Sequence, residues 1–264
     1  MTKPSANIHP EARIAKNVIV EPFATIYEDV EIGEGSWIGP NAILMPGARI
    51  GKNCKVFPGA VISADPQDLK FEGEYTTTEI GDHTTIREFV TINKGTKARG
   101  KTIVGSGCLL MSYVHIAHDC IVKDRVIIGS YAGLAGEVEV DSWAIVSPGS
   151  LVHQFVRIGS HVMIQGGSKV SKDVPPFILA GREPLSFTGI NSIGLRRRNF
   201  SNDIIYAIQE VYRILYQRGL NISDALDFID VNLPASNERD EIVLFVRKSK
   251  RGIIRGYFDG KDVE

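Results

Sequence analysis

Long apolar runs and cysteine are both scarce in this sequence. No stretch approaches the roughly 18 uninterrupted apolar residues that a membrane-spanning helix needs, so no membrane span is expected. The beginning of the chain, MTKPSANIHPEARI, lacks the apolar core of a secretory signal peptide. Only 3 of the 264 residues are cysteine. Together these features predict a cytoplasmic protein.

Neither charge sign is in excess. The chain has 30 basic and 31 acidic residues, spread along its length, for a formal net charge of -1. This balance gives no indication of a nucleic-acid partner. Hydrophobic residues make up 43% of the chain. A chain of this length and composition fits one large domain, or a solenoid with a small second domain.

The dominant feature that is present is an aliphatic residue at every sixth position. Ile, Leu or Val holds this position through residues 8–62, 80–92 and 104–170. A period of six matches neither an amphipathic helix nor a strand with alternating faces. It is a hexapeptide-repeat pattern, which predicts a parallel β-helix. Three hexapeptides form one triangular coil, so residues about 18 apart stack at about 4.8 Å.

The three cysteines follow the same period. Cys54, Cys108 and Cys120 each come four residues after a repeat aliphatic, where small or β-branched residues are otherwise found. That position faces the inside of the coil. Because free cysteine behaves as a small hydrophobic residue, we expect three reduced thiols that fill the core.

Two segments, 63–79 and 94–103, interrupt the repeat without shifting its frame. Insertions in a solenoid usually lie over its binding face, and they are also tolerated as plain surface excursions. Both interpretations remain open for these two loops.

The repeat pattern ends at Val174, before two prolines, and the apolar spacing then becomes helical. We therefore expect a β-helix over residues 1–190, followed by a small α-helical domain over residues 191–264. Three helices are expected in the second domain, over residues 201–219, 223–234 and 237–250.

The densest cluster of titratable groups lies in a well-formed repeat. His118 comes two residues after a repeat aliphatic, so we expect it near a corner of the coil with its side chain outward. Asp119 follows it, and Gly136 comes 18 residues later and should stack on it. A base beside an unobstructed backbone N–H suits acyl transfer, in which a hydroxyl is deprotonated while an oxyanion develops. The alternative is a solvated histidine on an exposed corner.

Zinc binding is the competing hypothesis for the histidines. His115 and His118 have a suitable spacing, but His153 comes almost two coils later, about 10 Å along the axis. Zinc ligands lie about 2.0–2.1 Å from the ion, so one chain cannot easily supply all three, although a second subunit could. We expect no metal.

A run of three arginines, Arg196–Arg198, lies close behind Asn191 and is the only run of three consecutive basic residues in the sequence. Such a run is either solvated surface or a diphosphate-binding group, because each guanidinium can donate two parallel hydrogen bonds.

With these motifs in view, the chain resembles the UDP-N-acetylglucosamine O-acyltransferases of lipid A biosynthesis over essentially its whole length. The resemblance implies a left-handed parallel β-helix that assembles as a homotrimer, with active sites between neighbouring subunits. The general rule for parallel crossovers predicts the opposite hand, so the handedness rests on the resemblance. The motifs that carry it are Pro66-Gln-Asp-Leu-Lys70, Ile86-Arg-Glu88, His115-Ile-Ala-His-Asp119, Leu134-Ala-Gly136, Val152-His-Gln-Phe155, Ser171-Lys-Asp-Val-Pro-Pro176 and Gly189-Ile-Asn191 with its arginines.

The resemblance also implies a reaction and its residues. An (R)-3-hydroxyacyl group would move from an acyl carrier protein thioester to the glucosamine 3-hydroxyl of UDP-N-acetylglucosamine. His118 matches the general base, Asp119 its support, and Gly136 the backbone donor to the oxyanion. No metal or cofactor is implied, because a thioester is already activated. The positions expected to bind substrate are Asp68, Lys70, His115, Glu137, His153, Gln154, Asn191, Arg197 and Arg198, and Gly166 matches the position that limits acyl length.

Two positions depart from the family pattern. Glu137 stands where the best-known members have a histidine, and Ile193 replaces an acidic residue. Either change could alter the sugar or uridine contacts, so the 3-amino analogue of the sugar nucleotide is an alternative acceptor. A glycine at residue 166 indicates room for a longer acyl chain.

Three other functions compete with this one. A metal-dependent hydratase on the same solenoid is disfavoured by the histidine spacing and by the segment from Asn191 to Arg198. The related N-acyltransferase normally carries an extra N-terminal domain, whereas here the repeats begin at Ile8. A non-catalytic scaffold would not need His118.

Overall fold

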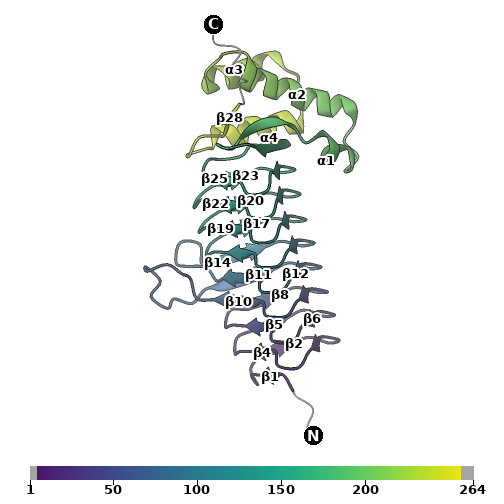
Figure 1. The fold of residues 1–264 in the computed structure, drawn as a ribbon, viewed down its shortest axis with the longest axis vertical. Coiled ribbons are helices and arrows are strands. Elements are labelled where there is room, and N and C mark those ends of the chain that lie inside the picture. The colour runs from purple at the N-terminus through teal and green to yellow at the C-terminus, as the bar shows by residue number, and fades with distance from the viewer. Residues whose placement is uncertain (1–4, 257–264) are drawn as a thin grey trace.

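In the computed structural model, the repeats wind into a triangular prism with one parallel β-sheet on each side (Figure 1). The structure describes residues 5–256. Most strands are two residues long, and successive strands up to β25 fall in successive sheets, so three strands make one coil. The repeat therefore produces one stack of coils, and each coil contacts its neighbours.

The strands of the three sheets are as follows. The first sheet contains β1 (Asn7–Ile8), β4 (Thr25–Ile26), β7 (Ile43–Leu44), β10 (Val61–Ala64), β13 (Thr91–Asn93), β16 (His115–Ile116), β19 (Gly133–Leu134), β22 (Leu151–Val152) and β25 (Lys169–Val170). The second contains β2 (Arg13–Ile14), β5 (Glu31–Ile32), β8 (Ala48–Ile50), β11 (Thr77–Ile80), β14 (Lys101–Val104), β17 (Ile121–Val122), β20 (Glu139–Val140) and β23 (Arg157–Ile158). The third contains β3 (Ile19–Val20), β6 (Trp37–Ile38), β9 (Lys55–Val56), β12 (Thr85–Ile86), β15 (Leu109–Leu110), β18 (Ile127–Ile128), β21 (Ile145–Val146), β24 (Met163–Ile164), β26 (Ile178–Gly181), β27 (Ser186–Ile190) and β28 (Arg255–Gly256).

The prism has three corners, which we name by the sheets that they join. The first corner joins the first sheet to the second, and the second corner joins the second sheet to the third. The third corner joins the third sheet back to the first. Many corner residues other than glycine have a positive φ, among them Asp119 at 59° and Glu137 at 60°. This conformation is costly for most side chains, so the stacked coils must hold it in place.

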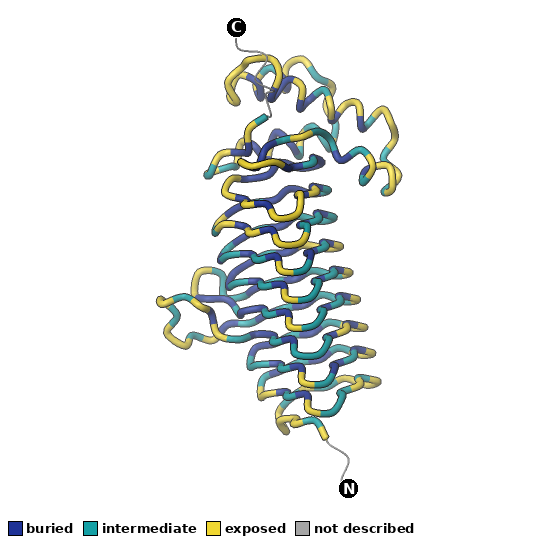
Figure 2. The backbone as a smooth tube through the Cα atoms, in the orientation of Figure 1, coloured by how far each residue is buried: buried dark blue, intermediate teal, exposed yellow. Residues whose placement is uncertain are grey.

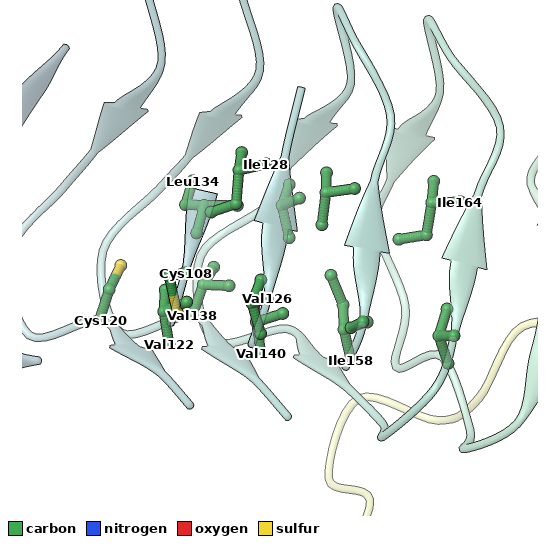
Figure 3. Close-up of a cluster of buried hydrophobic side chains, with 14 of the residues drawn as sticks. Cys108, Cys120, Val122, Val126, Ile128, Leu134, Val138, Val140, Ile158 and Ile164 are labelled. Atoms are coloured by element: carbon green, nitrogen blue, oxygen red, sulfur yellow. The ribbon is translucent and has the colours of Figure 1, made fainter. Parts of the chain in front are cut away.

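The repeat aliphatics form the core inside the prism (Figures 2 and 3). Ile62, Ile128 and Leu134 are completely buried, as are their equivalents in most coils. The three cysteines are free and buried among them, as predicted. Burial raises the pKa of all three thiols, that of Cys108 to about 11 and that of Cys120 to about 12.

This burial predicts unreactive thiols in the folded protein. At pH 8 the thiolate is the nucleophile, and both its fraction and its access to solvent are small at these three sites. A maleimide or disulfide reagent should therefore label none of the cysteines in native buffer and all three in denaturant, as counted by mass spectrometry. Fast labelling of the native protein would contradict the packing described here.

The strand register shows how the two loops are accommodated. Ile116 pairs with Leu134, 18 residues later. Across residues 63–79 the offset rises to 30, between Ile62 and Ile92. Across residues 94–103 it is 24, between Ile92 and Ile116. Both offsets are multiples of six, so each loop leaves the coil and returns without disturbing the inward positions, as the sequence predicted.

The carboxy-terminal region caps the upper end of the prism (Figure 1). The expectation that the repeat stops at Val174 is wrong by one strand, because β26 still pairs in parallel with β24. Strand β27 then runs antiparallel to β26, and β28 returns near the end of the described chain to pair with β27. The helices are α1 (Ser192–Arg196), α2 (Asn202–Gln217), α3 (Ile222–Asn232) and α4 (Asn237–Arg247).

The helix predictions were partly correct. Ser201 caps α2 as expected, since its side chain accepts a hydrogen bond from the Ile204 N–H. Helix α3 begins at Ile222 with Asn221 as its cap, so the predicted start at Ser223 is wrong. Helix α1 and strand β28 were not predicted, because one helical turn and a two-residue strand carry too little periodicity. No helix in the described part of the chain is long and apolar enough to cross a membrane.

Candidate active site

A vertical column of three predicted site residues runs along the first corner. The pairing of β16 with β19 and of β19 with β22 stacks His118, Gly136 and Gln154 in successive coils. Gly136 lies directly against the imidazole, and a Cβ built on it would come within 2.6 Å of both Cε1 and Nε2 of His118. The stacking predicted from the 18-residue spacing is therefore present, and only glycine fits beside this ring.

His118 lies at the first corner with its ring outside the core, as expected, and the alternative of a solvated histidine is wrong. Only 10% of its side chain is exposed. Its Nδ1 lies 2.8 Å from Oδ2 of Asp119, and its Nε2 lies 3.8 Å from Oδ2 of Asp68 in the 63–79 loop. The ring lies outside the core, as the repeat requires, but neighbouring polar groups cover it.

Asp119 is completely buried. Its Oδ1 accepts hydrogen bonds from the backbone N–H groups of Thr96 and Arg99, at 3.0 and 3.1 Å. Its Oδ2 accepts from the Thr96 hydroxyl at 2.7 Å, and its own N–H donates to the Thr102 hydroxyl. A buried carboxylate is costly unless hydrogen bonds satisfy it, and the 94–103 loop supplies these donors.

This arrangement orients a base. An ionised carboxylate only accepts hydrogen bonds, so the contact with Asp119 requires the proton of a neutral His118 to be on Nδ1. The lone pair of Nε2 is then available, and it points to the side where Asp68 lies. In the described part of the chain the N–H of Gly136 donates to no backbone carbonyl. A free base lone pair and a free N–H donor are thus next to each other.

A charged cleft of about 700 Å³ lies close to these groups, although neither His118 nor Gly136 lines it. It lies between the prism and the end of the helical region, and Glu137 and Phe155 form part of its wall. The Phe155 N–H donates to the Gly136 carbonyl, which ties this wall to the His118 column. The other residues that line the cleft are Arg99, Glu139, Arg157, Asp173, Lys248, Lys250 and Arg251.

Two further histidines and a lysine lie near the first corner. Nδ1 of His115 forms a 2.8 Å hydrogen bond with the Thr91 hydroxyl, and burial lowers the pKa of His115. It is therefore suited to hydrogen bonding as a neutral ring. His153 is exposed, and its Nδ1 lies 3.1 Å from the Gln154 carbonyl. Lys70 is exposed in the 63–79 loop, and its backbone N–H donates to Asp68.

The remaining predicted residues lie at other corners. Arg198 is at the second corner, where its guanidinium carbon lies 4.9 Å from the centre of the Trp143 ring. Asn191 is buried there, caps α1 and donates to the His161 carbonyl. Arg197 is exposed beside them. Gly166 is at the third corner, two residues after β24. One chain therefore does not bring these four residues to His118.

The zinc-binding hypothesis is not supported by a cluster of possible metal ligands in the described residues. Within residues 5–256, no group of three or more His, Cys, Asp and Glu side chains is arranged to hold a metal ion. The prediction of a metal-free reaction stays a prediction.

The chain is similar to known proteins over nearly its whole length. A hexapeptide-transferase model matches residues 29–64 and 101–136, and the model "Udp N-acetylglucosamine O-acyltransferase; Domain 2" matches residues 173–254. An acyl-[acyl-carrier-protein]–UDP-N-acetylglucosamine O-acyltransferase of Thiobacillus denitrificans is 42% identical over 96% of this chain and 98% of its own length. The chain belongs to the UDP-N-acetylglucosamine O-acyltransferase family.

Solved structures of this acyltransferase family have the same fold. LpxA of Bacteroides fragilis, described as a UDP-N-acetylglucosamine acyltransferase, is 55% identical, with a TM-score of 0.94 over 97% of this chain and all of its own. LpxA of Acinetobacter baumannii is 38% identical, with a TM-score of 0.92 over 95% of this chain and 98% of its own. The predicted left-handed parallel β-helix with a small helical region at its end is confirmed.

The residues that hold Asp119 in this acyltransferase were not predicted from the sequence. Thr96 and Arg99 are in a loop without hexapeptide periodicity, so the 18-residue spacing of stacked positions does not apply to them. The available signal was the interruption itself, since the 94–103 loop leaves the coil one turn before the coil that carries His118.

Proposed function

We propose that this acyltransferase moves an (R)-3-hydroxyacyl chain from acyl carrier protein to the glucosamine 3-hydroxyl of UDP-N-acetylglucosamine, in the first step of lipid A biosynthesis. The observation that carries the proposal is the geometry of His118. Its Nδ1 is held by Asp119 at 2.8 Å, and its Nε2 lies beside Gly136. This is the arrangement that a general-base acyl transfer needs. Family membership supports the substrate classes.

The chemistry follows from the positions of these groups. Nε2 of His118 takes the proton of the sugar 3-hydroxyl while that oxygen attacks the thioester carbonyl. The N–H of Gly136 donates to the oxyanion that forms, and Asp119 stabilises the imidazolium. When the tetrahedral intermediate collapses, the C–S bond breaks and the carrier-protein thiolate takes the proton from His118. The products are the 3-O-acylated sugar nucleotide and the free thiol, and no metal or cofactor is consumed.

We further propose that the working unit is a homotrimer. Within one chain, the predicted substrate-binding residues are divided between the first and second corners of the prism, and Gly166 is at the third. A ring with threefold symmetry places one face of each subunit against a different face of the next. Such an assembly would let Asn191, Arg197 and Arg198 of one copy approach the His118 column of another.

Two features support the remaining expectations about partners and compartment. The cleft beside Glu137 is lined by five basic and three acidic residues, which suits an anionic donor such as an acyl carrier protein. The three free, buried cysteines suit the reducing cytoplasm, in which we place the enzyme.

The test is a transfer assay with the purified enzyme. Both UDP-N-acetylglucosamine and its 3-amino analogue are offered with a series of acyl carrier protein thioesters, with and without a chelator. We expect kcat/KM to be higher for UDP-N-acetylglucosamine, for 3-hydroxyacyl chains and for longer chains, because Gly166 adds no side chain to its corner. Chelation should leave the rate unchanged.

Each result of this assay has a separate meaning. A higher kcat/KM for the 3-amino analogue would reassign the acceptor and give Glu137 a role in that choice. Preference for the shortest chains would contradict the expectation for Gly166. A stoichiometric zinc whose removal abolishes turnover would overturn the metal-free mechanism, and no transfer at all would overturn the proposal.

A further inference from the structure

One carboxylate oxygen of Asp119 links the loop at residues 94–103 to His118. Oδ2 of Asp119 lies 2.8 Å from Nδ1 of His118 and 2.7 Å from the hydroxyl of Thr96. The same oxygen therefore accepts hydrogen bonds from both side chains. The Thr96 N–H lies 3.0 Å from Oδ1 and 3.1 Å from Oδ2, so it does not distinguish the two oxygens, whereas the Thr96 hydroxyl contacts only Oδ2. Thr96 is 7% exposed, so water does not readily replace its hydroxyl in this contact.

The direction of the Thr96 hydrogen bond follows from its other partner. The hydroxyl oxygen of Thr96 accepts a hydrogen bond from the Ala98 N–H at 3.2 Å. Its only proton is then free to donate, and the ionised Asp119 can only accept. The chain of hydrogen bonds is thus fixed from Thr96 O–H to Asp119 and from His118 Nδ1–H to the same oxygen.

The loop itself is anchored independently of Asp119. The Thr76 hydroxyl donates to the Gly95 carbonyl at 2.6 Å, and the Gly95 N–H donates to the Thr77 carbonyl at 3.2 Å. These contacts hold Thr96 at the end of a fixed segment. Thr96 is therefore part of a preformed site, and it would not have to fold around the carboxylate.

We propose that Thr96 is a positioning residue for the acyl transfer and acts on His118 through Asp119. Its hydroxyl keeps Oδ2 of Asp119 facing Nδ1 of His118, so that the ring stays in the tautomer and orientation in which Nε2 can act as the base. This role rests on the proposed function, in which His118 is the base. It gives the 94–103 insertion a purpose beyond that of a surface excursion.

A rotated carboxylate would still be buried and still accept from two backbone N–H groups, so the fold would survive its rotation. The imidazole would not keep its orientation, because Oδ2 is the Asp119 oxygen that contacts Nδ1. Loss of a hydrogen bond to a charged group shifts the equilibrium between the two orientations of the carboxylate by about tenfold or more. The proposal therefore predicts a loss in kcat with little change in KM.

The experiment compares four variants of Thr96 and Thr76 with the wild-type enzyme in the transfer assay. Thr96→Val and Thr96→Ala remove the hydroxyl and should lower kcat about tenfold, while KM for both substrates changes less than about twofold. Thr96→Ser keeps the hydroxyl and should restore most of the rate. Thr76→Val is the matched control, because it removes a buried hydroxyl that anchors the same loop without touching Asp119.

Thermal unfolding of each variant identifies any that fails to fold, and Thr96→Ala then replaces Thr96→Val. A wild-type kcat in the variants that lack the hydroxyl would overturn the proposal. An equal loss in Thr76→Val, or no recovery in Thr96→Ser, would also overturn it, since either result assigns the effect to loop structure. His118→Ala distinguishes failure of the proposed function from failure of the role of Thr96. If His118→Ala keeps full turnover, His118 is not the base. If His118→Ala is inactive and Thr96→Val is normal, only the role of Thr96 is wrong.

Discussion

Replacing His118 with alanine is expected to lower the rate of acyl transfer by about 10²–10⁴-fold, the usual contribution of a positioned general base. Without the imidazole, the acceptor hydroxyl must lose its proton to water or hydroxide. The loss should therefore appear in kcat and become smaller as the pH rises. Steady-state assays between pH 6 and 9, with both substrates varied, would measure it.

The fold should tolerate this change, so the measurement reports on chemistry. Asp119 keeps its hydrogen bonds from Thr96 and Arg99 when the ring is removed. His9→Ala is a matched control, because His9 is exposed in the first coil, far along the chain from this site. Unchanged turnover in His118→Ala, or an equal loss in His9→Ala, would rule out His118 as the base.

Periodicity made the scaffold and part of the site predictable. A strict period of six determines which positions of each hexapeptide face the core, which is why the cysteines could be placed there. The same period stacks residues 18 apart, which is why Gly136 could be placed against His118. Both inferences depend only on strand register, and a buried face strongly specifies register.

The surroundings of His118 could not be predicted in the same way. Asp68 lies beside its Nε2, and Thr96 holds the Asp119 carboxylate beside its Nδ1; both residues lie in segments that interrupt the repeat. A loop has no period, so its path depends on individual contacts such as the hydrogen bond from Thr76 to Gly95. The predicted position near a corner, outside the core, was correct, whereas the contacts from the loops could not be predicted from the repeat.

The second corner illustrates a different limit. The run Arg196–Arg198 was visible in the sequence, but its position depends on the end of the prism and on α1, which the sequence did not reveal. Asn191 is buried as the cap of that short helix. Within one chain these residues lie at a different corner from His118. Their predicted role therefore depends on the proposed trimer, which no local sequence pattern indicates.

Replacing Gly136 with alanine is expected to lower kcat/KM by about 10²-fold, although alanine keeps the backbone N–H that would serve the oxyanion. The new Cβ would come within 2.6 Å of Cε1 and Nε2 of His118, so the ring must move. The ring cannot rotate freely, because Asp119 holds Nδ1 at 2.8 Å. A displacement of about 1 Å at a catalytic group can cost 10²-fold.

The matched control for this variant is Gly133→Ala in the same coil. A Cβ at Gly133 meets only Leu151 Cδ2, at 3.4 Å, so activity should stay near that of the wild type. The decisive comparison is the double variant with His118→Ala. If Gly136→Ala acts by displacing the imidazole, it should lower the rate little once that ring is gone, because effects that share one group are not additive. A further 10²-fold loss in the double variant would instead assign the effect of Gly136 to the oxyanion donor or to local folding, and thermal unfolding of the variants distinguishes these two causes.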